Sequence, residues 1–139
     1  MARDHRGEVI FLRGISNHLC RPTQAEVDAL LWAMKLVIQE QWSVVIFEGD
    51  AKICIDALSN SKLIPDWYST ATISNIRCLS SHFTAVKFSW VRRLGNLAAH
   101  EIAKFALNSN LDFCFNNGNL PPSLEAICMG DSSVCSFSV

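Results

Sequence analysis

The sequence predicts a single α/β domain whose sheet has a parallel portion. Strand-like and helix-like segments alternate along the chain, which is the order expected of this class. The run Val44–Phe47 is apolar without interruption, as expected of a strand that is covered on both faces of its sheet. The chain has 139 residues, which is enough for one ordinary domain and too few for two.

The first predicted elements are a hairpin and a long helix. Asp4–Gly7 is a turn signal, so residues 1–16 are predicted to be the end of one strand, a turn and a second strand, followed by a loop over 17–22. Thr23 and Glu26 have the spacing of a capping box, and a helix is predicted over 24–41. The stripe expected to face the core consists of Glu26, Leu30, Ala33 and Val37.

The chain after residue 50 adds three helices and one strand. Helices are predicted over 51–58, 69–83 and 97–107, and a strand over 84–91. Phe88 and Trp90 of that strand are expected in the core, and Asn96 is a candidate cap for the last helix. Breakers follow residue 108, so residues 109–139 are expected to form a tail outside the domain. Residues 134–139 alternate weakly, as a strand would.

Composition narrows the class of protein. Lys and Arg total 12 and Asp and Glu total 13, for a net charge of −1. This balance excludes a strongly basic nucleic-acid-binding arm and allows a local basic patch. Half of the residues are hydrophobic and 18% are charged, so extended disorder is not expected.

The sequence also indicates the cellular compartment in which the protein is expected. Residues 1–9 show no apolar stretch behind a basic start, and Ala29–Ile38 is shorter than the roughly 20 residues of a membrane span. Six cysteines show no C-x-x-C spacing, and we interpret them as reduced thiols rather than disulfides or zinc ligands. We therefore expect a cytoplasmic or nuclear protein without a membrane partner.

Three polar residues stand where α/β proteins place functional groups. Asp50 comes just after a buried strand, Glu26 lies on the first long helix, and His100 lies near the start of the last helix. Carboxylates together with a histidine suit Mg²⁺ or Mn²⁺, which prefer oxygen ligands. Each residue also has a simpler interpretation, because Glu26 and Asp50 could cap helices and His100 could be an ordinary half-buried side chain.

The order of these motifs resembles the type-1 ribonuclease H domain, in the plant version found in retrotransposon-related and reverse-transcriptase-like proteins. The resemblance covers residues 1–108 and includes the hairpin at Asp4 and Trp67 before the third helix. Its main motifs are Ala25-Glu26, Glu48-Gly49-Asp50, and Arg92–His100 followed by Ile102-Ala103-Lys104. It implies a three-layer fold with a mixed sheet flanked by helices.

The resemblance implies an activity and roles for the residues. Proteins of this family hydrolyse the RNA strand of RNA–DNA hybrids with two metal ions held by four acidic positions. By resemblance, Glu26 and Asp50 are metal ligands, and His100 is a ligand or a catalytic group that aids product release. Mg²⁺ or Mn²⁺ is the implied cofactor. Arg92, Arg93 and Asn96 are the candidate nucleic-acid contacts.

One part of the family pattern has no counterpart in this sequence. The fourth carboxylate of the family lies on a first, central strand, and this sequence begins inside what resembles the second strand. We therefore expect weak metal binding, weak or absent cleavage, and open strand edges that another strand could pair with. Residues 134–139 are one candidate for that position.

Two further functions are also compatible with the sequence. The first is a non-catalytic module of the same fold that binds nucleic acid or protein. The second, from a different class, is a thiol-dependent enzyme that uses Cys54 and His100.

Overall fold

A computed structural model describes residues 1–15, 21–63, 66–109, 112–116 and 118–130. The chain divides into two compact units. The first, here called the terminal unit, combines the N-terminal hairpin with the residues from Arg92 onward. The second, the central unit, comprises the described residues from Arg21 to Val91.

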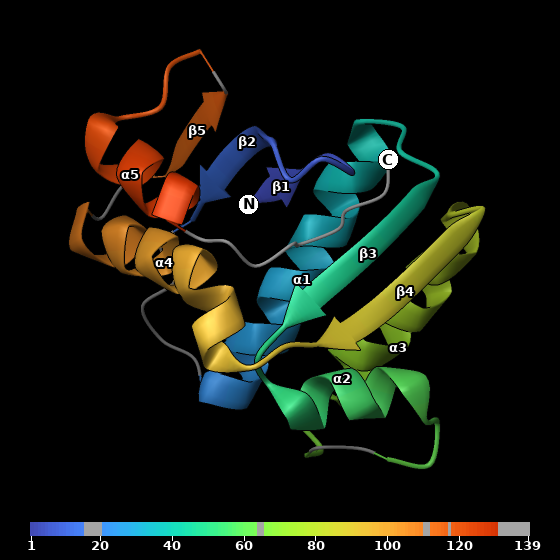
Figure 1. The fold of residues 1–139 in the computed structure, drawn as a ribbon. Helices are drawn as coiled ribbons and strands as arrows, with labels where there is room; N and C mark the ends of the chain where they lie inside the picture. Colours follow the sequence, from blue (N-terminus) through green and yellow to red (C-terminus); the bar gives the residue numbers. More distant parts are fainter. Residues whose placement is uncertain (16–20, 64–65, 110–111, 117, 131–139) are drawn as a thin grey trace. The chain divides into compact units, whose positions relative to one another are not determined.

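The central unit contains a pair of parallel strands and three α-helices (Figure 1). The strands run in register from Val44 opposite Ala85 to Gly49 opposite Trp90. Its elements are α1 (Pro22–Gln39), β3 (Val44–Gly49), α2 (Lys52–Ser59), α3 (Thr70–Leu79), the 3₁₀ turn η1 (Ser80–His82) and β4 (Ala85–Trp90). The predicted strand at 44–47 is confirmed, but only Val45 and Phe47 are buried, and Val44 is exposed, so the strand is not covered equally on both faces.

The core of the central unit is assembled from the apolar sides of these elements. Phe47 lies against Phe83 edge to face and stacks on Phe88, with ring centroids 5.9 and 5.8 Å apart. The other buried side chains include Val27, Met34, Val37, Val45, Ile73 and Ile76. Phe83, which follows η1, is also buried.

Two predictions about α1 are wrong. The helix begins at Pro22, with Arg21 as its N-cap and no side-chain cap, so the capping box at Thr23 and Glu26 does not form. Proline at the first helical position needs no N–H partner there, which lets the helix start earlier than predicted. The buried stripe contains Val27, Met34 and Val37, and Glu26 is exposed because neighbouring helical residues point about 100° apart.

The terminal unit is built around a three-stranded antiparallel sheet with the order β1-β2-β5 (Figure 1). Its elements are β1 (Ala2–Arg3), β2 (Val9–Gly14), the 3₁₀ turn η2 (Arg93–Asn96), α4 (Leu97–Ser109), β5 (Phe113–Asn116) and α5 (Pro122–Gly130). Leu12, Ile102, Leu124 and Cys128 form its buried core. Both units together confirm the mixed α/β class.

The predicted hairpin is confirmed, and its turn has a clear cause. One carboxylate oxygen of Asp4 accepts hydrogen bonds from the backbone N–H groups of Arg6 and Glu8, each 2.9 Å long. Gly7 adopts a φ of 82°, which glycine tolerates better than other residues. The turn therefore sets the register of β1 against β2.

Residues beyond 108, expected to be a tail, contribute regular structure to the terminal unit. β5 pairs with β2 from Phe11 opposite Asn116 to Gly14 opposite Phe113. Leu124 of α5 is almost fully buried. Residues 134–139, proposed above as a strand that fills an open edge, lie outside the described residues.

Candidate functional site

Asp50 lies directly after β3, at the carboxyl end of the parallel pair. Its backbone oxygen accepts hydrogen bonds from the N–H of Lys52, at 3.0 Å, and from the indole N–H of Trp90, at 3.2 Å. The residue is half-buried, and α2 has Ala51 as its N-cap with no side-chain cap. The N-cap of α2 is therefore Ala51 and not Asp50.

Trp90 does not belong to the core as predicted. Its side chain is 41% exposed, and Phe88 is only half-buried. The indole N–H finds its partner at the Asp50 carbonyl, at the end of the neighbouring strand. A buried indole needs a hydrogen-bond partner for its N–H inside the core. Here the partner lies at the end of a strand, so the ring stays at the surface.

Glu26 is exposed on α1, close to the thiol of Cys54 on α2. The sulfur of Cys54 lies 3.9 Å from the backbone oxygen of Thr23. Burial first, and then the negative charges of Glu26 and Asp66, raise the pKa of the Cys54 thiol to about 11. The two carboxylates therefore lie near the same sulfur atom.

The environment of Cys54 argues against a thiol-dependent enzyme. A thiol with a pKa of about 11 is protonated near neutral pH, and the protonated form is a poor nucleophile. Cys54, Cys78, Cys114 and Cys128, the described cysteines, are all free thiols.

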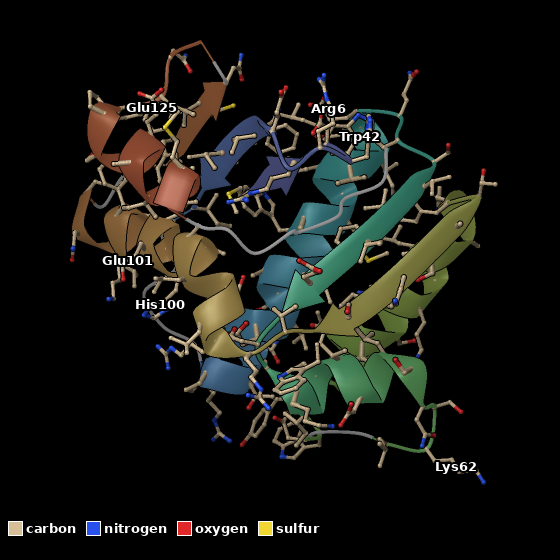
Figure 2. The ribbon with its side chains drawn as sticks, viewed as in Figure 1. Arg6, Trp42, Lys62, His100, Glu101 and Glu125 are labelled. Atoms are coloured by element: carbon tan, nitrogen blue, oxygen red, sulfur yellow. The ribbon has the colours of Figure 1, made fainter. Side chains whose placement is uncertain are left out.

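His100 lies on α4 of the terminal unit, where it contacts Arg93. A guanidinium nitrogen of Arg93 lies 3.1 Å from Nε2 and 3.4 Å from Nδ1 of the imidazole. Figure 2 shows His100 and Glu101 side by side on α4, with both side chains directed outward from the helix. Because arginine is always charged and only donates hydrogen bonds, the imidazole faces a cation and acts as the acceptor.

The candidate nucleic-acid contacts lie in and next to η2. Arg92 and Arg93 are exposed, and Asn96 is half-buried at the end of the turn. The N–H of Gly95 donates to the backbone oxygen of Arg92 at 2.8 Å, which closes the turn. Two exposed arginines on a tight turn can approach a phosphate backbone without large rearrangement.

The acidic residues of the central unit have the chemistry that a hard divalent cation requires. Oxygen Oε2 of Glu48 is buried and has no hydrogen-bond partner among the described residues. Glu48 precedes Asp50 by two residues, so carboxylates gather at the end of β3. An orphaned carboxylate oxygen of this kind fits Mg²⁺ or Mn²⁺. Within the described ranges, however, no group of three acidic, histidine or cysteine residues could already hold an ion.

Two features of the central unit could not be predicted from the sequence. One is the orphaned oxygen of Glu48, which only the packing around β3 reveals. The other is a surface stack of Arg21, Tyr68 and Trp67. The consecutive aromatic residues after Pro65 were a visible signal, but nothing in the sequence placed Arg21 beside them.

The fold and these positions define an α/β protein with acidic groups after a parallel strand. Residues 1–106 match the family described as reverse transcriptase-like, so the chain belongs to this family of RNase H-like domains. The match ends within α4, and β5 and α5 follow it. No curated protein and no solved structure matches the chain. None of the described helices combines the length and the apolar character needed to cross a membrane.

Family membership supports a nucleic-acid-related function of the RNase H-like type. RNase H-like domains generally use divalent metal ions. Glu26, Glu48 and Asp50 belong to the central unit, whereas Arg92, Arg93, Asn96 and His100 belong to the terminal unit.

Proposed function

We propose that this chain binds RNA–DNA hybrids and hydrolyses their RNA strand weakly, with Mg²⁺ or Mn²⁺. The observation that supports this most directly is the place of Asp50, immediately after the parallel strand β3 in a chain of the reverse transcriptase-like family. Substrates and metals bind beyond the carboxyl ends of such strands in α/β proteins.

Glu26 and Asp50 are the proposed metal ligands, with the orphaned oxygen of Glu48 as a further candidate. When bound, a divalent ion would stabilise negative charge on the scissile phosphate. The exposed position of Glu26 and the small number of carboxylates favour weak ion binding, and therefore weak hydrolysis. The backbone carbonyl of Asp50 is fixed by hydrogen bonds from the N–H of Lys52 and the indole N–H of Trp90.

The basic residues of the terminal unit are proposed to contact the phosphate backbone. Arg92 and Arg93 would supply positive charge, and Asn96 a hydrogen bond. The contact between Arg93 and His100 favours a role for His100 in handling phosphate or aiding product release over a role as metal ligand. A cation beside the imidazole opposes the approach of a second cation.

A second candidate is a non-catalytic module that binds nucleic acid without cleaving it. It is favoured by the same contact, since His100 here pairs with a guanidinium. In either case the free thiols of the described cysteines suit the reducing cytoplasm or nucleus, where we propose that the protein works.

Cleavage is tested with an end-labelled RNA–DNA hybrid and Mn²⁺, beside the variant Asp50→Asn. Asp56→Asn is the matched control, because Asp56 is a surface carboxylate of α2 that pairs with Lys52. Cleavage that is lost on chelation and in Asp50→Asn, but kept in Asp56→Asn, supports hydrolysis. Equal cleavage by Asp50→Asn would refute it, and hybrid binding without any cleavage would favour the module.

Binding is tested by the salt dependence of hybrid affinity. Replacing Arg93 with Ala should weaken binding and lower the slope of log affinity against log salt by about one phosphate contact. Arg6→Ala is the matched control, because Arg6 pairs with Asp4 and Glu8 in the hairpin turn. Equal slopes for wild type and Arg93→Ala would contradict the proposed phosphate contact.

A further inference from the structure

The surface of the central unit displays an unusual stack of three side chains. Trp67 is 74% exposed, although large aromatic side chains usually lose most of their exposure on folding. Its ring lies against Tyr68, with centroids 3.6 Å apart and planes inclined by 31°. The guanidinium carbon of Arg21 lies over the ring of Tyr68, 3.9 Å from its centroid. We call these three residues the aromatic platform.

The backbone beneath the platform is fixed. A carboxylate oxygen of Asp66 accepts a 2.8 Å hydrogen bond from the N–H of Ser69, which closes the turn that holds the two rings. Ser69 is fully buried, and its hydroxyl lies 3.5 Å from the side-chain oxygen of Gln24 on α1. The rings are therefore exposed on an anchored turn, and binding to them would cost little ordering entropy.

The charge of the platform favours a nucleic acid over an apolar partner. The ion pairs within the described ranges join other residues, and none involves Arg21. Arg21 is also the N-cap of α1, where the helix dipole adds positive potential. An exposed indole face, together with a guanidinium stacked on the neighbouring tyrosine ring, matches the two parts of a nucleotide, its flat base and its phosphate.

We propose that the aromatic platform binds an unpaired nucleotide, whose base stacks on Trp67 and whose phosphate contacts Arg21. The proposal rests on the proposed function and adds a preference for hybrids that continue into a single strand. Stacking is tolerant of base identity, because every base has a flat π-face. We therefore expect little sequence preference at this position.

The platform lies near one of the candidate metal ligands of the same unit. Asp66, which precedes Trp67, and Glu26 both act on the thiol of Cys54. Thr23, two residues after Arg21, lies 3.9 Å from that sulfur through its backbone oxygen.

The test compares two fluorescent ligands, a blunt RNA–DNA hybrid and the same hybrid with a short single-stranded extension, in the absence of divalent metal. Wild type should bind the extended hybrid more tightly. Trp67→Ala should weaken that binding by about 5- to 150-fold, the range measured for one stacked base, and should leave blunt binding unchanged. Trp67→Phe, which keeps a flat ring, should retain most of the affinity.

The matched control is Met129→Ala, because Met129 is a large apolar side chain of the terminal unit that is 79% exposed. It should bind both ligands as wild type does. Arg21→Ala should weaken binding of the extended hybrid and reduce its salt dependence. Thermal unfolding followed by circular dichroism confirms that each variant is folded.

The outcomes separate this inference from the proposed function. If wild type binds both hybrids equally, or if Trp67→Ala leaves extended binding unchanged, the platform has no role and the proposed function stands. If the extended hybrid is bound only when Trp67 is present, and the blunt hybrid is not bound at all, the platform is confirmed and hybrid recognition fails. Dimerisation that Trp67→Ala abolishes, without nucleic-acid binding, assigns the platform to a second copy and overturns the inference.

Discussion

Replacing Gly14 with Ala should destabilise the terminal unit, because the new methyl group has no room. A Cβ at this position would lie 2.5 and 2.6 Å from two ring carbons of Phe113, and 3.1 Å from the Cβ of Ala106. Carbon atoms in contact are normally about 3.5–4.0 Å apart. The ring of Phe113 must therefore move by about 1 Å to accept the methyl group.

The size of the effect follows from what holds Phe113 in place. Its ring packs edge to face on Phe105, with centroids 5.3 Å apart, and stacks on Phe115 at 5.1 Å. Overpacking of a core typically costs about 1–3 kcal/mol, and each aromatic pair contributes about 0.5–1.5 kcal/mol. We expect Gly14→Ala to lower the free energy of unfolding of the terminal unit by about 2 kcal/mol.

Hydrogen–deuterium exchange of β2 and β5 is the appropriate assay. All four tryptophans and the single tyrosine lie between residues 32 and 90, so intrinsic fluorescence reports only on the central unit. A loss of about 2 kcal/mol corresponds to exchange that is roughly 30-fold faster in β2 and β5. Fluorescence-detected unfolding measures the central unit in the same sample.

Two variants make the test specific. Gly118→Ala is the control, because a Cβ at Gly118 would meet nothing within 4 Å. Phe113→Leu should reduce the cost of Gly14→Ala in a double-mutant cycle, since it removes the ring that the methyl group meets. Equal exchange rates for Gly14→Ala and Gly118→Ala would refute the steric reasoning.

Three further predictions concern the turn, a helix end and a buried thiol. Asp4→Ala should speed amide exchange in the first hairpin, because two backbone N–H groups lose their acceptor, and unchanged exchange would contradict this. Arg77→Ala should lower the free energy of unfolding of the central unit by about 1–3 kcal/mol, because the carbonyls of Ala57 and Asn60 lose their charged donor. An unchanged midpoint of urea unfolding, followed by fluorescence, would count against this. The contribution of Cys54 to the free energy of unfolding should be constant below pH 9, the ordinary pKa of a thiol, and should decrease toward pH 11, because its raised pKa favours the protonated thiol in the folded state. Cys54→Ala should flatten this decline in urea unfolding measured against pH, and a slope equal to that of wild type would contradict the assignment.

Much of the fold follows from local sequence. The apolar run at Val44–Phe47 predicts β3, and Asp4 with Gly7 predicts the hairpin turn. In both cases the cause lies within a few residues, either as a continuous apolar pattern or as a side chain that bonds its own turn. The position of Asp50 after β3 belongs to the same group, since it follows once the strand is placed.

Other features depend on residues that are distant in the sequence. The pattern of α1 allowed Glu26 to face the core, and packing within the central unit buried Val27 instead. β5 could not be predicted, because its four residues gain their stability from pairing with β2, about a hundred residues earlier.

The same distinction between local sequence and distant residues applies to the candidate site. The sequence alone determined which residues could perform the chemistry, namely the carboxylates Glu26 and Asp50, the histidine and the arginines near η2. Only the tertiary structure decided that Arg93 contacts His100 and that Arg21 lies on Tyr68. The physical reason is that residue type sets what a side chain can bind, whereas its neighbours through space set its charge environment, its exposure and its partners.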